Sequence, residues 1–199
     1  MIKVNKDKLE WVSQGDIFKD VDYIEYVVEK DGVIEASKIR FPLIIVLSQE
    51  CDLRYDFKFR SAKSETKTQD KLLLSVLVAP LYNVEHVYAG EQLSELNIIM
   101  EPINRNKTPG EDLRKNLRPR YHYLEFPADI PIVSSVIDFK HYFSVNVDYL
   151  RELKKENFVC KVSELYREDI SHRFASFLSR IGLPELADQP VAEKPGQNK

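Results

Sequence analysis

The chain has 199 residues, enough for one generous domain or one domain with an appendage. A hydrophobic fraction of 43% and a charged fraction of 31% are typical of a globular protein in water, and the net charge of −3 argues against a protein wrapped in nucleic acid over its whole surface. The sequence contains no run of roughly 20 apolar residues that could span a bilayer, and two distant cysteines suggest no disulfide framework. We therefore expect a reduced, cytoplasmic protein that does not enter a membrane.

The first part of the chain predicts strands. Residues 11–28 are rich in β-branched and aromatic side chains without one clean alternation, which predicts a long, bulged strand or hairpin arm. The Asp31-Gly32 pair that follows is a hairpin turn signal. The apolar run at 43–47 then predicts a buried central strand, with Pro42 at its start, where a missing N–H is tolerated.

The middle of the chain gives weaker signals. Residues 54–71 are polar and charge-rich, so we expect a loop there, with a mobile surface segment at 61–68. Residues 72–79 predict a second buried strand, stopped by Pro80 and lying beside the first in one sheet. The remaining expected elements are helices at 91–100 and 110–116 and strands at 121–126 and 130–136.

The C-terminal third changes to a helical period. Residues 147–156 look helical, and residues 163–180 predict a second helix that packs on the sheet through one apolar stripe. The stripe consists of Ile170, Phe174, Phe177, Leu178 and Ile181. Gly182 and Pro184 form a helix stop, and residues 184–199 have the low apolar content of a disordered tail.

Strands followed by helices predict a mainly β protein of the α+β class, with a small β-barrel, a helical insertion and C-terminal helices. We expect a single globular domain at 1–183, with the barrel core at about 11–149 and the C-terminal helices at about 147–182.

The central strand ends in the polar cluster Ser48-Gln49-Glu50-Cys51-Asp52. A rigid strand that ends in groups able to donate, accept or ligate is a common support for chemistry. Asp52 is a candidate general base, with a turn-forming role as the alternative. Cys51 has two acidic neighbours that disfavour a thiolate, so we expect it to be buried and structural. Because no Cys or His stands at metal spacing from Cys51, we expect no metal and no cofactor.

Basic residues are concentrated in one segment of the chain, which ends beside two tyrosines. They are Arg105, Lys107, Arg114, Lys115, Arg118, Arg120 and His122. Arginine forks bind phosphates, and tyrosines can stack on unpaired bases. The candidate RNA-binding residues are therefore Arg114, Arg118, Arg120, Tyr121 and Tyr123. His122 has the best surroundings for acid–base chemistry among the histidines, and a solvated loop is the alternative for the whole segment.

Four motifs occur in an order that resembles the PemK/MazF toxins. They are Gln14-Gly15-Asp16-Ile17, Arg40-Phe41-Pro42 before a β-branched strand, the strand at 73–80, and the segment Pro131-Ile-Val-Ser-Ser-Val-Ile-Asp138. The resemblance covers about 14–149 with a large insertion at 81–120. It implies an SH3-like barrel and endoribonuclease activity, in a toxin–antitoxin or phage-defence context. Arg40 matches the family's arginine position, and Val78-Ala79-Pro80 stands where the family carries a threonine.

Two hypotheses follow. In the first, the protein binds or cleaves single-stranded RNA without a metal, an arginine neutralising the phosphorane while a base activates the ribose 2′-OH. Its candidate catalytic residues are Arg40, Ser48, Gln49, Asp52 and His122. In the second, a non-catalytic barrel binds a protein partner. The basic, aromatic segment favours the first hypothesis, whereas the missing threonine and a pI near 5.9 favour the second.

Overall fold

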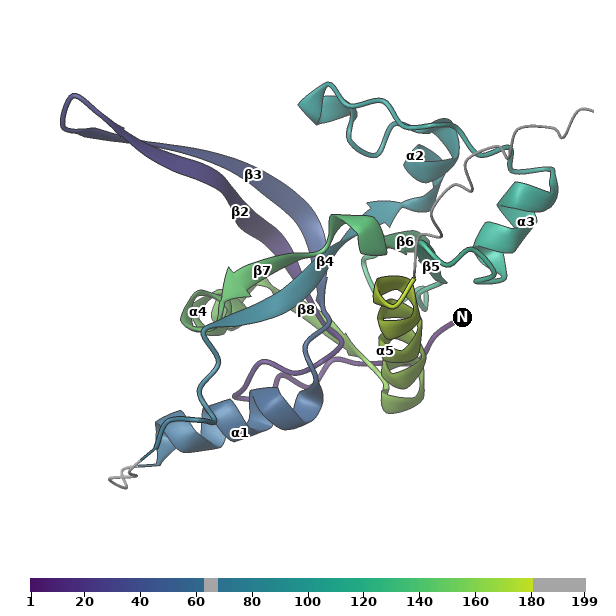
Figure 1. The fold of residues 1–199 in the computed structure, drawn as a ribbon. Helices are drawn as coiled ribbons and strands as arrows, with labels where there is room; N and C mark the ends of the chain where they lie inside the picture. The colour runs from purple at the N-terminus through teal and green to yellow at the C-terminus, as the bar shows by residue number, and fades with distance from the viewer. Residues whose placement is uncertain (63–67, 181–199) are drawn as a thin grey trace, which may run out of the picture.

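The computed structural model describes residues 1–62 and 68–180 and shows a curled antiparallel sheet with helices around it (Figure 1). The strands are β1 (Val4–Asn5), β2 (Asp16–Lys30), β3 (Val33–Val46), β4 (Ser75–Asn83), β5 (Tyr121–Leu124), β6 (Ser135–Asp138), β7 (Phe143–Asn146) and β8 (Phe158–Val162). The helices are α1 (Glu50–Ser61), α2 (Val84–Ala89), α3 (Thr108–Arg114), α4 (Val147–Asn157) and α5 (Glu164–Leu178), with 3₁₀ turns η1 (Ser94–Leu96) and η2 (Phe139–His141). The fold is therefore mixed α+β.

The sheet has the strand order β1-β8-β2-β3-β4-β6-β5, with β7 also paired to β4. Strand β4 holds the sheet together because it pairs β7 through residues 75–78, β3 through 78–80 and β6 through 81–83. This change of partner along one strand curls the sheet into a half-barrel.

The two apolar runs at 43–47 and 72–79 are adjacent in the sheet, as predicted, with Ile45 opposite Ala79 and Val46 opposite Val78. The expected stop at Pro80 is wrong, since β4 continues to Asn83. Proline removes a ladder donor but keeps an extended φ. At this point β4 leaves β3 and pairs β6 instead, with Leu81 opposite Ile137.

Two apolar clusters fill the space around the curled sheet. One lies under α5, whose Ile170, Phe174 and Phe177 pack with side chains of β2, β3 and β4. The predicted packing of this stripe is thus confirmed for three members, while Leu178 is 49% exposed and Ile181 lies outside the described residues. The other cluster lies between the β2–β3 pair, β7 and α4.

A third apolar cluster packs α2 and α3 against β5 and β6. It contains Tyr82, Val84, Val87, Tyr88, Ile103, Leu113, Tyr121 and Val136. The insertion at 84–114 is therefore packed on the sheet. The predicted helix at 110–116 is present as α3, shifted toward the N-terminus.

Several sequence predictions are wrong. The expected loop at 54–71 begins instead as helix α1, whose acidic first turn and basic last turn complement the helix dipole. The expected helix at 91–100 is only η1: Gly90 caps α2 with a φ of +76°, and Asn97 also has a left-handed φ of 58°. The strand expected at 130–136 starts later, at Ser135. Most of the segment predicted to be mobile, 61–68, lies outside the described residues, which omit 63–67. The predicted tail, 184–199, lies wholly outside them, because 181–199 are not described.

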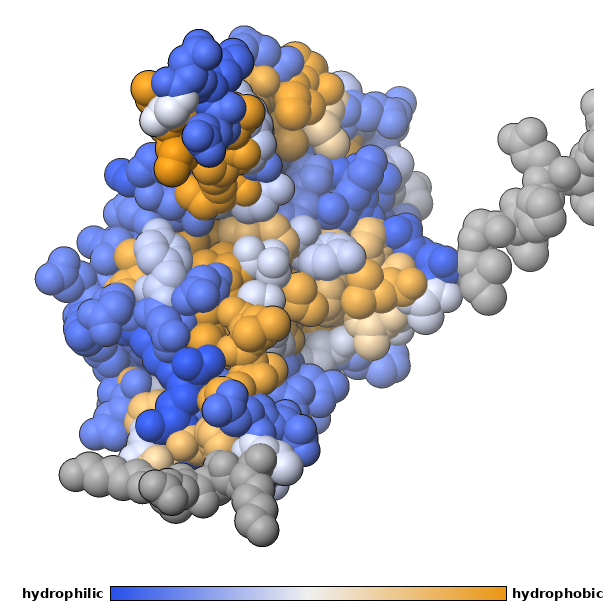
Figure 2. Space-filling view, turned by 60° about the vertical axis from the view of Figure 1, so that its left-hand side comes forward, coloured by the Kyte–Doolittle hydropathy of each residue, from blue (hydrophilic) through white to orange (hydrophobic). Residues whose placement is uncertain are grey.

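Strands β2 and β3 form a long hairpin that projects from the body (Figure 1). Its turn residues Asp31 and Gly32 have φ values of 52° and 77°, as a type I′ turn requires, so the Asp-Gly prediction is confirmed. The predicted irregularity is a register shift between Ile24 and Tyr26. We call residues 24–38 the arm. Figure 2, which brings this side forward, shows apolar side chains on it between charged ones.

Within the described part of the chain, no helix is both long and apolar enough to cross a membrane.

Candidate nucleic-acid interface

The polar cluster after β3 forms the start of helix α1. Ser48 Oγ accepts a hydrogen bond of 2.8 Å from the Leu77 N–H and so links the end of β3 to β4. Gln49 is the exposed residue before α1, and Asp52 is exposed in its first turn. The expected burial of Cys51 is wrong, because Cys51 is exposed whereas Cys160 is the buried free cysteine.

Glu50 is the structurally important member of this cluster, and sequence reasoning missed it. Its carboxylate accepts hydrogen bonds of 2.9 Å from the Gln14 backbone N–H and 3.2 Å from Trp11 Nε1. Lys161 and Arg167 lie 3.6 and 3.5 Å from the same carboxylate. Glu50 therefore ties the N-terminal segment, α1, β8 and α5 together, which accounts for an acidic residue at this position without catalysis.

Arg40 lies on β3 near the base of the arm. Its Nε donates to Asp22 Oδ1 at 2.7 Å, and Lys38 Nζ donates to Asp22 Oδ2 at 2.8 Å. Hydrogen bonds from Arg40 and Lys38 lower the pKa of Asp22 to about 2. The Arg40 guanidinium is thus engaged in an exposed ion pair, on a strand separated from that of His122 by β4 and β6.

His122 is buried on β5, only 2% exposed. Burial, reinforced by the positive charge of Arg173, lowers its pKa to about 3. Its Nε2 lies 3.9 Å from Asp169 Oδ2, and its Nδ1 has no hydrogen-bond partner within residues 1–62 and 68–180. A neutral, enclosed imidazole of this kind does not reach a substrate in this conformation. The structure therefore does not gather Arg40, the cluster at 48–52 and His122 into one site.

Two of the predicted RNA-binding arginines do share a site. Arg118 and Arg120 line a polar cavity of about 440 Å³, together with Tyr121 and with Arg180, which lies two residues after the end of α5. Glu101, Asn104 and prolines complete its walls. Arg180 was missed because 60 residues separate it from the basic segment, and only the packing of α5 brings it there.

The four side chains of this arginine cavity are held in different ways. Asp138, fully buried, accepts hydrogen bonds of 2.8 and 2.5 Å from Arg120 Nε and Nη2. The ring of Tyr121 lies 4.9 Å from the Arg120 guanidinium carbon and 5.5 Å from that of Arg118. Arg180 Nε donates to the Phe177 carbonyl, and its guanidinium stacks on the Phe177 ring at 3.8 Å.

Charge in this region is only partly neutralised. Arg105, Lys115 and Arg120 each pair with a carboxylate. Arg118 and Arg180, in contrast, form no ion pair with any residue that the structure describes. Among the described residues, the cavity thus presents two guanidinium groups without an ion-pair partner, beside a third that is fixed in place, with Glu101 also in its wall.

The predicted aromatic stacking role is not supported by the exposure of the tyrosines. Tyr121 is 6% exposed, and burial raises its pKa. Tyr123 packs partly against the third cluster, and its backbone N–H donates to Asn116 Oδ1. Arg114 is exposed on α3 and does not line the cavity. Within this geometry the cavity can bind an anion, but it offers no open aromatic face to a base.

No group of three or more His, Cys, Asp or Glu side chains that could hold a metal ion occurs in residues 1–62 and 68–180. Searches of family models, curated proteins and solved structures find no match to this chain.

Proposed function

We propose that the protein binds single-stranded RNA through the sugar–phosphate backbone at the arginine cavity. The observation that supports this most directly is that Arg118 and Arg180 line one polar cavity and that neither pairs with a carboxylate of a described residue. Arginine is suited to this task because its planar fork can donate two parallel hydrogen bonds to a phosphate.

Each arginine has a distinct role in this proposal. Asp138 occupies two donors of Arg120, so Arg120 stays rigid and adds positive charge at the cavity wall. Arg180 is held at Nε by the Phe177 carbonyl and by the Phe177 ring, so in this proposal its Nη groups, together with the guanidinium of Arg118, donate to phosphate oxygens. Contacts of this kind fix the strand on the protein but carry no base information. We therefore expect binding with little sequence preference.

The PemK/MazF resemblance would add cleavage to binding. Cleavage needs a base within reach of the ribose 2′-OH, beside a group that stabilises the phosphorane. The candidate residues for those roles lie apart, and His122 is enclosed. We therefore propose binding without cleavage, in a toxin–antitoxin or phage-defence setting that the resemblance suggests.

The test is fluorescence anisotropy with a labelled single-stranded RNA oligonucleotide. Because a neutralised phosphate contributes a slope of about 0.7 in log K against log salt, two contacts should weaken binding roughly sevenfold between about 50 and 200 mM salt. The double variant Arg118→Glu, Arg180→Glu should bind weakly and lose about that part of the slope. Arg120 is left unchanged, because its reversal would leave Asp138 buried without a cation.

Arg54→Glu is the matched control, since Arg54 is an exposed arginine on α1 at another part of the molecule. It should leave binding unchanged. The proposal fails if wild-type protein shows no salt-dependent binding at low ionic strength, or if Arg54→Glu weakens binding as much as the double variant. Incubation of the RNA with the protein, followed by electrophoresis, distinguishes binding from cleavage. Specific cleavage products would refute the proposal that the protein binds RNA without cleaving it.

A further inference from the structure

Strands β3 and β4 separate after a short stretch of pairing. Their last pair is Ile44 with Pro80, after which β4 turns to β6 while β3 continues outward with β2 alone. Pro42 and Pro80 both lie at this divergence and both lack an N–H, so two ladder donors are missing where the strands part. The result is a wedge between two strands of one sheet.

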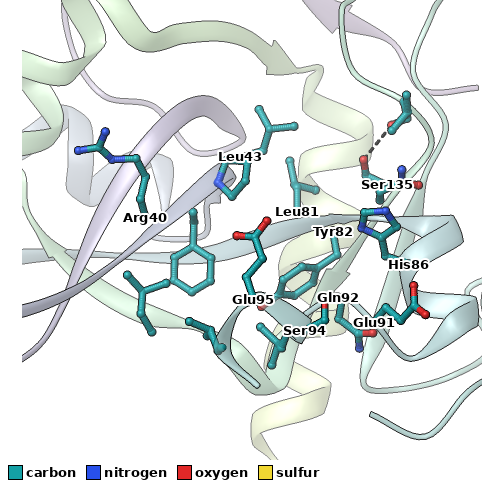
Figure 3. Close-up of a pocket in the computed structure, with 17 residues that line it drawn as sticks. Arg40, Leu43, Leu81, Tyr82, His86, Glu91, Gln92, Ser94, Glu95 and Ser135 are labelled. Atoms are coloured by element: carbon teal, nitrogen blue, oxygen red, sulfur yellow. Dashed lines mark hydrogen bonds between the residues drawn. The ribbon is translucent and has the colours of Figure 1, made fainter. Parts of the chain in front are cut away.

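A cavity of about 310 Å³ occupies this wedge (Figure 3). Strand β3 contributes residues 39–43, β4 contributes residues 81–83, and the segment around η1 closes the third side. The walls are largely apolar, and Phe41, Leu43, Leu93 and Leu96 are among the residues that line them. In Figure 3 the Glu95 carboxylate points toward the strand side, whereas the Arg40 guanidinium points away.

One polar atom in this wall lacks a partner. Gln92 Oε1 is buried and accepts no hydrogen bond from the residues that the structure describes. A buried carbonyl oxygen without a donor costs about 1–3 kcal/mol.

The arm next to the wedge is an open strand edge. At residues 33–42, β3 pairs β2 on one side, and no described strand pairs its other side. Large apolar side chains are exposed along the arm: Ile24, Tyr26, Val27, Val28, Val33 and Ile34. A two-stranded ribbon is marginally stable in water, and an unpaired edge is a template for another strand.

The charge around this edge is predominantly acidic. Between residues 25 and 35 the acidic side chains are Glu25, Glu29, Asp31 and Glu35, against the single cation Lys30. Glu91 and Glu95 add two exposed carboxylates at the wedge. Lys38 and Arg40 share the single carboxylate of Asp22, so these three side chains together add one positive charge. With Lys30, they leave a net charge of −4 against the six carboxylates of the arm and the wedge.

We propose that an extended, basic segment of a partner protein adds as a strand to the outer edge of β3 at residues 33–42. Alternating basic and aliphatic residues fit this edge, because side chains of a strand alternate between its faces. One apolar side chain of the segment enters the wedge cavity. A second copy of this chain fits less well, since two acidic arms would face each other.

The probe is a fluorescein-labelled, nine-residue peptide of alternating lysine and valine. It should bind the full chain, and hydrogen exchange should slow at residues 33–42 when it does. N-methylation of alternate amides should weaken binding about tenfold or more, because backbone hydrogen bonds supply the affinity of strand addition. Replacement of its lysines by glutamate should abolish binding, because the edge is acidic.

The protein variants locate the site. Glu91→Gln with Glu95→Gln should weaken binding several-fold, and Val133→Trp, at an exposed position in the cavity wall, should weaken it by filling the wedge. Glu152→Gln with Glu156→Gln on α4 is the charge-matched control and should leave binding unchanged.

The proposal is overturned if no peptide binds, if the N-methylated peptide binds equally well, or if protection appears elsewhere. Protein-concentration-dependent protection of the arm without peptide would also overturn it, in favour of self-association. These outcomes are independent of RNA binding, which uses other residues.

Discussion

Replacement of Glu50 by alanine should destabilise the protein far more than the same change at Asp52, two residues away. Both carboxylates lie in the first turn of α1, and the helix dipole favours a negative charge at either position. Only Glu50, however, joins α1 to three other parts of the molecule. The comparison therefore separates a local helix effect from a tertiary one.

The magnitude follows from the groups left behind. Without Glu50, the Gln14 N–H loses its acceptor at 2.9 Å and the Trp11 indole loses one at 3.2 Å. An unsatisfied, largely buried donor costs about 1–3 kcal/mol. Lys161 and Arg167, with side chains 15% and 11% exposed, also lose a nearby carboxylate. We expect a total loss of about 3 kcal/mol for Glu50→Ala, against at most about 1 kcal/mol for the exposed Asp52→Ala.

Urea unfolding followed by circular dichroism measures both free energies; Trp11 fluorescence is unsuitable because Trp11 contacts Glu50. For a chain of this size, about 3 kcal/mol corresponds to roughly 6–12 °C in Tm. Glu50→Gln, which keeps an acceptor but removes the charge, should lie between wild type and Glu50→Ala. Equal losses for Glu50→Ala and Asp52→Ala would refute the tertiary role of Glu50.

Two further predictions concern buried groups. His122 has a pKa of about 3 in the folded protein against 6.5 for a free imidazole, so the unfolded chain binds the extra proton first. The free energy of unfolding should therefore fall as the pH drops from about 6.5 toward 3, by up to about 1.4 kcal/mol per pH unit. The variant His122→Gln should lack this contribution. If wild type and variant showed the same pH dependence, His122 would not be buried in its neutral form. For the thiols, burial raises the pKa of Cys160 to about 12, so a thiol reagent should titrate Cys51 alone in the native protein and both cysteines in denaturant. Rapid reaction of native Cys51→Ser protein would show that Cys160 is accessible.

The hairpin turn, two helices and the pairing of two apolar strands could be predicted from short stretches of sequence. The Asp31-Gly32 pair favours positive φ at both positions, so the hairpin turn could be identified before its partners were known. Helices α4 and α5 follow from the change to a helical period. The apolar runs at 43–47 and 72–79 were expected to pair because both must be buried in the core, and they do pair.

The short strands β7 and β8 could not be found in the same way. Each has four or five residues and depends on a partner distant in sequence, such as Ile17 for Cys160. Helix α1 was missed because it buries little apolar surface: only Leu53 and Asp56 are buried in it. Its charged sequence resembles a loop when its tertiary contacts are unknown.

The basic segment, the hairpin and the apolar strands could be recognised from the order of residues, because composition, turn chemistry and periodicity are properties of neighbouring residues. Packing between distant segments, in contrast, placed Arg180 and Arg118 in one cavity, enclosed His122 and made Glu50 a contact between four segments. It also opened the wedge where β3 and β4 part. These features depend on contacts between segments tens of residues apart, which the packing of α5 and the curl of the sheet decide.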